Sequence, residues 1–298
     1  MPRLNNTLIA AVAALAVSAA AQTPLSSLHQ ARDSREPVEA SAEAVARRVQ
    51  DRDMGRDSRM TFRMRLFDRH NRVRERVMIL SGLRGRSAPG ASPSAPEGDR
   101  LLIRFTYPND IRGTGFLVWE HPGSDDERFL FLPSLGRVRR IAGTEAQESF
   151  VGSDFTYEEI GGREFDEYTY AFAGSDGQRA SWTPPSGGPA NDAWRLESRR
   201  KDRSAAFPRV VSLILKDSLM VVQADIYNRR NERQKVYTVT RLEQIEKIWT
   251  ATSSVMTNAL EKSRTELSVE AVDYNVGLKE PDFSRRELER APVRPPAP

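Results

Sequence analysis

The chain of 298 residues contains no cysteine. This absence excludes disulfide bonds, thiolate chemistry and zinc sites built on cysteine. It also removes the lipid-carrying cysteine of a bacterial lipoprotein, so we expect a protein that is not a lipoprotein. Without disulfides the fold has to rely on a hydrophobic core, and hydrophobic residues make up 39% of this sequence, which is enough for a large one.

Histidine, the usual catalytic base and metal ligand, is almost as scarce: there are three, His29, His70 and His121. They are far apart in the sequence and none has the spacing of a metal motif, so we predict no metal site. A Ser153–His121–Asp154 arrangement is the remaining candidate for nucleophilic catalysis. However, "VGSDF" lacks the small-residue elbow that exposes a nucleophilic serine. We therefore expect neither an enzyme nor a bound cofactor.

Blocks of like charge are also missing. The 45 Lys and Arg residues and 41 Asp and Glu residues are interleaved along the chain and leave a net charge of +4. A nucleic-acid-binding protein usually gathers its cations on one face or tail. Nucleic acid is therefore not an expected partner.

Long apolar runs are confined to the N-terminus. Residues 7–21 read "TLIAAVAALAVSAAA", follow a single cation, Arg3, and end in small residues. The run is shorter than the about 20 residues of a comfortable membrane span, and it has the parts of a secretory signal peptide. We expect residues 1–21 to be a signal peptide cleaved after Ala21, with an uncleaved anchor as the alternative.

The remainder of the chain is dominated by strand patterns. A polar spacer (22–36) leads to one amphipathic helix near residues 42–49, where apolar residues recur at helical spacing. Short segments of period two then follow one another, bounded by Gly, Pro or Asp, with 60–66 as the clearest case. About eleven such strands without βα alternation predict one antiparallel β domain over 37–290, a sandwich or barrel. A disordered Pro-rich tail (291–298) follows.

A sheet of this size has to curl, and a wide barrel can leave room for a ligand. Methionine beside phenylalanine on one strand face would give an adaptable lining suited to acyl chains. A solid packed core is the alternative. The residues that we expect to line a ligand cavity are Met60, Phe62, Met64, Leu66, Phe105, Tyr107, Phe116 and Phe131.

Three segments carry a family resemblance: "TYPNDIRGTGFLVWE" (106–120), "FLFLPSLGRVRRIAG" (129–143) and "SFVGSDFTYEEI" (149–160), supported by the late "YNVGL…DFSRREL". They resemble the LolA-like periplasmic lipoprotein-sorting proteins, the branch of the LolA/LolB-type carriers found beside RND-superfamily exporters. The resemblance implies a half-open antiparallel β-barrel wrapped on a helix, located in the periplasm and not enzymatic. It also implies a lipid or acylated ligand, exchanged with an RND-superfamily permease or an outer-membrane acceptor.

Two loops, 83–99 and 174–192, are longer than in the classical carriers, so the identity of the cargo does not carry over. The same scaffold also occurs in periplasmic lipid sensors or adaptors that regulate an anti-sigma factor or an envelope complex. That role is the alternative function.

Carriers of this type place a lid-like segment after the sixth strand, where this chain has "ESFVGSDFTYEEIGG" (148–162). Thr156 and Glu159 have capping-box spacing for a short helix that Gly161 can end. We expect an acidic residue at the bend to cap the lid backbone or to pair with Arg139 or Arg140. A plain connecting loop is the alternative. The acidic residue at the bend is Asp154. The expected lid residues are Phe150, Gly152, Ser153, Asp154, Phe155, Tyr157 and Ile160.

Overall fold

The computed structural model describes residues 41–86, 95–162 and 165–290. The predicted signal peptide (1–21), with its cleavage after Ala21, lies outside these residues, as do the predicted spacer and tail. None of the helices in the described part of the chain is long and apolar enough to span a membrane.

Fourteen strands form one antiparallel sheet in the described residues. The N-terminal half contributes β1 (Asp57–Phe67), β2 (Val73–Leu83), β3 (Arg100–Tyr107), β4 (Gly115–Trp119), β5 (Glu127–Leu132) and β6 (Arg137–Ile141). The C-terminal half contributes β7 (Tyr168–Phe172), β8 (Ala180–Trp182), β9 (Asn191–Arg200), β10 (Arg209–Leu215), β11 (Val221–Tyr227), β12 (Arg233–Ile245), β13 (Ile248–Asn258) and β14 (Ser263–Tyr274). The predicted mainly β, half-open architecture is confirmed, whereas the predicted number of about eleven strands is too low.

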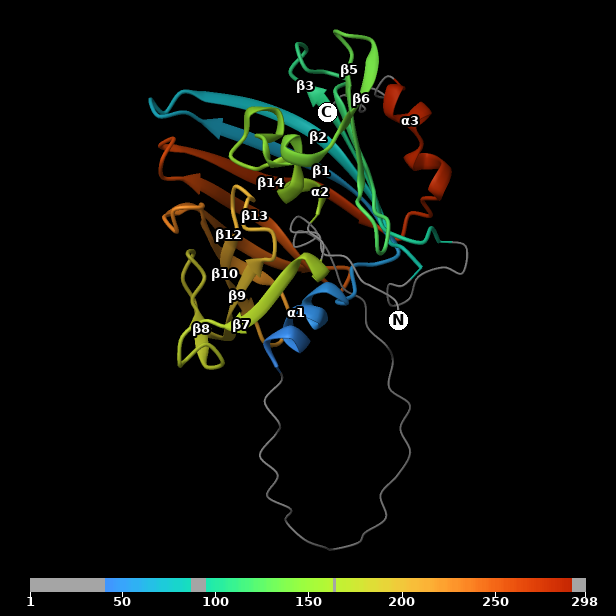
Figure 1. The fold of residues 1–298 in the computed structure, drawn as a ribbon. Coiled ribbons are helices and arrows are strands. Elements are labelled where there is room, and N and C mark those ends of the chain that lie inside the picture. The colour runs from blue at the N-terminus through green and yellow to red at the C-terminus, as the bar shows by residue number, and fades with distance from the viewer. Residues whose placement is uncertain (1–40, 87–94, 163–164, 291–298) are drawn as a thin grey trace, which may run out of the picture.

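The order of the strands is β6-β5-β4-β3-β2-β1-β14-β13-β12-β11-β10-β9-β7, with β8 paired to β9. The first and last strands of the chain therefore meet in the middle of the sheet, where β1 and β14 pair from Ser58↔Tyr274 to Phe67↔Arg264. The two outer strands, β6 and β7, are consecutive in sequence. The segment that joins them has to cross from one edge of the curved sheet to the other, and Figure 1 shows it on one side of the sheet.

Alternation along the strands determines which face is buried. In β1 the side chains of Met60, Phe62, Met64 and Leu66 are buried on the face that carries the main core. On the other face Arg63 forms ion pairs with Glu75 of β2 and with Glu270 of β14. Such cross-strand charge pairs are typical of a solvated sheet face.

Two helices pack against the sheet. The helix near the N-terminus packs on strands of the C-terminal half, and the helix near the C-terminus packs on strands of the N-terminal half. α1 (Ala42–Gln50) is capped by Ser41 and packs its Val45 and Val49 against Leu196 and other residues of the C-terminal half. α3 (Arg285–Glu289) follows the 3-10 helix η5 (Glu280–Phe283) and covers the outer face of β4 and β5. Ser284 caps this last helix, because its side chain accepts a hydrogen bond from the backbone N–H of Glu287.

Candidate ligand-binding site

The segment between β6 and β7 contains the predicted lid, residues 148–162. Two 3-10 helices, η2 (Gly143–Gln147) and η3 (Phe150–Gly152), precede the short helix α2 (Tyr157–Gly161). The predicted capping box is confirmed: Thr156 Oγ1 accepts from Glu159 N at 3.0 Å, and Glu159 Oε2 accepts from Thr156 N at 2.8 Å. The predicted bend is also present, with positive φ at Gly152 (75°) and at Val151 (48°).

The apolar side chains of the lid are buried in the main core of the sheet. Phe150, Phe155, Tyr157 and Ile160 are between 0% and 7% exposed and belong to the same cluster as the inward residues of β1, β3 and β4. The ring centroids of Phe116 and Phe150 are 5.5 Å apart, within the range of favourable aromatic contacts. The lid therefore occupies the concave face as part of the packed core.

A buried ion pair holds the centre of the lid. Lys235 of β12 and Glu159 of α2 are 2% and 1% exposed, and their Nζ and Oε2 atoms are 2.6 Å apart. Lys235 Nζ also donates to the backbone oxygen of Asp154 at 3.1 Å and lies 4.2 Å from the ring centroid of Phe207. One cation of the C-terminal half thus contacts both the helix of the lid and the turn before it.

Three arginines contact the lid from both halves of the sheet. Arg76 of β2 donates to the backbone oxygen of Val151. Arg128 of β5 donates to the backbone oxygen of Gly162 at 3.2 Å, and Arg200 of β9 pairs with Glu158 at 2.5 Å. Because these contacts come from strands on either side of β1 and β14, the predicted lid segment bridges the two halves of the sheet.

Asp154 is held by hydroxyl groups of β14. Its carboxylate accepts hydrogen bonds from Ser263 Oγ and from Thr265 Oγ1, the latter at 2.7 Å. The pairing predicted with Arg139 or Arg140 is wrong: Arg139 pairs with Glu145 at 3.1 Å, and Arg140 lies 3.9 Å from Glu127. The expected anchoring role goes to β14, which approaches the bend although it is more than a hundred residues away in sequence.

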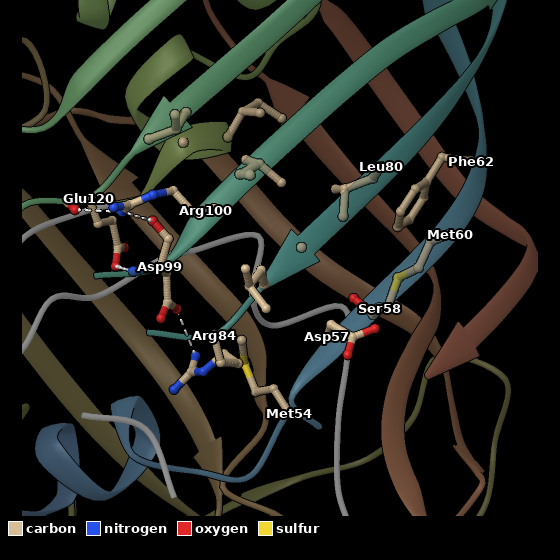
Figure 2. A pocket seen from close by; sticks show the side chains of 16 residues that line it. Met54, Asp57, Ser58, Met60, Phe62, Leu80, Arg84, Asp99, Arg100 and Glu120 are labelled. Atoms are coloured by element: carbon tan, nitrogen blue, oxygen red, sulfur yellow. Dashed lines mark hydrogen bonds and ion pairs between the residues drawn. The ribbon is translucent and has the colours of Figure 1, made fainter. Parts of the chain in front are cut away.

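A cavity of about 80 Å³ remains beside the lid on the concave face. Its inner wall includes Met60, Phe62 and Ile160, and its rim is polar, with Arg84 and Arg100 among the lining residues (Figure 2). An apolar cavity of about 150 Å³ is needed to hold a benzene-sized molecule. In this arrangement of the segment 148–162, the space is therefore too small for an acyl chain.

The rim of this cavity is a hydrogen-bonded charged network. Arg100 donates to the backbone oxygens of Gly98 and Glu120, both at 3.0 Å, and the backbone N–H of Asp99 donates to the Glu120 carboxylate at 3.1 Å (Figure 2). Arg84 pairs with Asp99 at 3.1 Å. The charged groups of the rim thus form hydrogen bonds and ion pairs with one another. The rim of the cavity is polar, whereas its inner wall is apolar.

Six of the eight predicted cavity residues lie together on the concave face. They are buried in the main core: Met60, Phe62, Met64, Leu66, Phe105 and Phe116. The other two were wrongly placed. Tyr107, the last residue of β3, is 51% exposed. Phe131 packs against the cluster beneath α3 on the opposite face, because it follows Phe129 by two positions and shares its side of β5.

A second, charged cavity of about 160 Å³ lies where α2 ends. Asp126, Glu158 and Glu167 line it together with Arg128 and Arg200. Burial raises the pKa of the Asp126 and Glu167 carboxyl groups, and the neighbouring arginines offset part of the effect. The charges that hold the end of the lid are therefore partly removed from water.

The sequence interpretation missed the four cations that hold the lid. One signal was present for Lys235, which alternates with Tyr237 and Val239 on the inward face of β12. A lysine among buried apolar positions needs a buried acidic partner. Within the described residues, no group of three or more His, Cys, Asp or Glu side chains could hold a metal ion.

Comparison with known proteins connects this arrangement to other structures. A putative outer membrane lipoprotein-sorting protein domain from Vibrio parahaemolyticus is 27% identical, with a TM-score of 0.72 over 84% of this chain and 98% of that one. A DUF1329 family protein from Desulfovibrio piger is also 27% identical, with a TM-score of 0.71 over 85% and 100% of the two chains. A LolA superfamily protein from Nitrosomonas europaea has the same fold at 15% identity, with a TM-score of 0.59 over 83% and 99%.

No curated protein matches the chain. A family model described as that of an uncharacterized protein matches residues 97–290, which is more than half of the sequence. The expected resemblance to LolA-like lipoprotein-sorting proteins is confirmed. The chain belongs to this family of uncharacterized proteins, and it shares its fold with a putative outer membrane lipoprotein-sorting protein domain and with a LolA superfamily protein.

Proposed function

We propose that the protein is a periplasmic carrier, not an enzyme, that binds the acyl chains of a lipid or lipidated ligand on the concave face of the sheet. The observation that carries this proposal is the lid. Its four large apolar side chains occupy the concave face, and its backbone is held by polar contacts that can be broken and remade. The name of the Vibrio relative, a lipoprotein-sorting domain, supports the same class of ligand.

Ligand entry requires the lid to leave the concave face. Withdrawal of Phe150, Phe155, Tyr157 and Ile160 exposes apolar surface, and burial of one such side chain is worth about 1.5–3 kcal/mol. An acyl chain regains about 0.8 kcal/mol for each CH₂ group that it buries. A chain of ten or more CH₂ groups can therefore replace the contacts of the lid, and the open state becomes favoured when the ligand is present.

The location and the partners follow from the same proposal. A secretory signal peptide cleaved after Ala21 would deliver the protein to the periplasm, where acylated molecules need a protein that shields their chains from water. The ligand would then pass to or from an RND-superfamily permease or an outer-membrane acceptor. Ligand binding is expected for either direction of transfer.

The test uses protein purified after export and a dansyl-labelled undecanoic acid. We expect saturable binding with a blue-shifted emission, and native mass spectrometry of the untreated protein should detect a co-purified lipid. Lid movement is measured in a Ser153→Cys variant, which carries the only thiol because the natural chain has no cysteine. Ser153 is 8% exposed, so its thiol should react slowly with a maleimide and faster when the fatty acid holds the lid open.

A Ser134→Cys variant is the matched control, because Ser134 lies in the exposed β5–β6 turn and should react equally fast with and without the ligand. Absence of both fatty-acid binding and co-purified lipid would overturn the proposal. Binding without any change in the reactivity of Ser153→Cys would place the ligand outside the concave face.

A further inference from the structure

Exposed apolar side chains gather at one end of the strands. The exposed large hydrophobic residues of the described chain are Val73, Tyr107, Leu135, Leu260 and Val276, with exposed fractions between 45% and 57%. The first four lie at strand ends or turns on the side where β1 ends, and only Val276 lies at the opposite end. Single exposed hydrophobic residues need no explanation, but their concentration at one end does.

Three hairpin tips at this end are neighbours in the sheet. They are residues 68–74, which form the β1–β2 turn and the start of β2, residues 259–262 between β13 and β14, and residues 228–233, which form the β11–β12 turn and the first residue of β12. We call them together the tip surface. Phe67 pairs with Arg264, and Asn258 pairs with Lys235, so the three tips follow one another across the sheet. Since each hairpin contains two strands about 4.8 Å apart, neighbouring tips are about 10 Å apart.

The tip surface is basic as well as apolar. Its exposed cations are Arg69, Arg72, Arg74, Arg229, Arg230, Arg233 and Lys262, and its acids are Asp68, Glu232 and Glu261. Asp68 is already paired with Arg72, and Glu232 accepts a hydrogen bond from Asn228. The tip surface therefore presents a positive field in which Val73 and Leu260 protrude.

The opposite end of the strands has no comparable excess of cations. In the described connections there, exposed acids such as Glu97, Asp125 and Glu246 are balanced by exposed cations such as Arg86 and Lys247. The positive charge is thus concentrated at one end of the strands, although the net charge of the molecule is only +4. Such an asymmetry orients a protein in front of a charged surface.

The tip surface also lies next to the bend of the lid. Asp154 is held by Ser263 and Thr265, which directly follow the 259–262 tip. Arg76, which donates to the backbone oxygen of Val151, lies two residues after Arg74 of the 68–74 tip. Contacts made by the tips are therefore close to the contacts that keep the lid closed.

We propose that the tip surface docks the protein onto an anionic phospholipid bilayer, an inference that rests on the proposed carrier function. The arginines bind lipid phosphates, and Leu260 and Val73 enter the boundary between headgroups and acyl chains. Isolated apolar side chains flanked by cations on separate turns suit this interface. An acidic protein partner would be expected to offer pockets for the apolar side chains. Measurement of vesicle binding distinguishes a bilayer from such a protein partner.

The experiment measures sedimentation with large unilamellar vesicles of equal parts phosphatidylglycerol and phosphatidylcholine. One basic residue near an anionic surface contributes about a fivefold gain in binding. Arg229→Ser/Arg230→Ser should therefore weaken binding by about 25-fold. Both side chains are exposed at the β11–β12 turn, so the fold should not change. Leu260→Asn should weaken binding by about tenfold and leave its salt dependence unchanged.

The matched control is Arg179→Ser/Lys247→Ser, which removes the same charge at the opposite end of the strands and should change binding by less than about threefold. All these proteins share the same N-terminal segment, so differences between them report on the tips. No binding to phosphatidylglycerol vesicles in low salt, or equal losses in the tip and control variants, would overturn the proposal and favour a protein partner. Loss of dansyl fatty-acid binding with intact vesicle binding would instead contradict the carrier function alone.

Discussion

Lys235 and Glu159 show how a buried charge can specify a structure without adding much stability. Both side chains are almost completely removed from water, and this desolvation cancels most of their attraction. Their pairing is satisfied in only one position of α2, since Glu159 also caps that helix through Thr156. We therefore interpret the pair as the contact that determines where the closed lid lies.

Removal of Lys235 alone should be far more costly than removal of the pair. Lys235→Met leaves the Glu159 carboxylate buried and without this cation, so we expect a loss of about 3–5 kcal/mol in the free energy of unfolding. In Lys235→Met/Glu159→Gln the second change removes the charge and keeps a side chain able to cap the helix. The measurement is urea unfolding of the natural protein, the two single variants and the double variant. The double variant should recover most of the free energy of unfolding that Lys235→Met loses. A double variant as unstable as Lys235→Met would contradict the interpretation.

At the scale of elements, α2 depends on charged neighbours more than on its own length. A helix of five residues has no stability alone. Its first turn is capped by Thr156, and its end is held by Arg128 and Arg200 at the charged cavity. Asp126 pairs with Arg128 at 2.8 Å and so supports one of these two contacts.

Asp126 gives the lid end a measurable pH dependence. Burial raises the pKa of its carboxyl above 3.8, and Arg128 lowers it by a smaller amount. The folded state then keeps a proton that the unfolded state releases. The contribution of the Asp126 carboxyl group to the free energy of unfolding is therefore complete below pH 3.8. It is lost as the pH rises past the pKa that this group has in the folded protein. Relative to Asp126→Asn, the natural protein should lose free energy of unfolding as the pH is raised from 3.8 toward neutrality.

The measurement is denaturant unfolding of both proteins across this range, with the exposed neighbour Asp125 changed to Asn as the matched control. The control should differ from the natural protein by a nearly constant amount. A natural protein that gains stability over Asp126→Asn as the pH rises would mean that attraction by Arg128 outweighs burial.

Local patterns were sufficient to predict most elements. The capping box at Thr156 and the alternation of β1 depend on residues that are neighbours in sequence, and both predictions are confirmed. The sequence of β13 shows no clear alternation, because several of its inward positions carry Thr250, Thr252 and Ser254 instead of large apolar side chains. Buried hydroxyl groups such as that of Thr250, which lies 2.8 Å from the Tyr274 hydroxyl, hide the alternation that marks a strand.

It was harder to predict which side chains of a strand lie on the concave face of the sheet. In β4 and β5 both faces are apolar, because the lid covers one face and α3 covers the other. Alternation alone could not assign Phe131 to the correct side. The contacts that join the lid to Lys235 of β12 and to Thr265 of β14 link residues that are 76 to 111 positions apart, so no local pattern reports them.

At the scale of the whole molecule, the two halves of the chain are interlocked. β1 and β14 pair over ten residue positions in the centre of the sheet. α1 packs on the C-terminal half, and Phe283 and Leu288 pack on the N-terminal half. The lid lies in the stretch that joins β6 to β7 along the chain, and it is one of several structures that hold the halves together.

Cleavage of the lid should therefore leave the fold intact. A protease recognition sequence inserted between Gly152 and Ser153, where the backbone bends and Gly152 is exposed, allows a single cut. We expect the two fragments to remain together in gel filtration and to unfold in one cooperative transition, because β1–β14 pairing and both helix contacts survive the cut. The cut separates the Arg76 contact from the Lys235 contact, so the dansyl fatty acid should exchange faster than in the uncut insertion protein. Fragments that separate under native conditions would show that the continuous lid, and not the central strand pair, holds the two halves together.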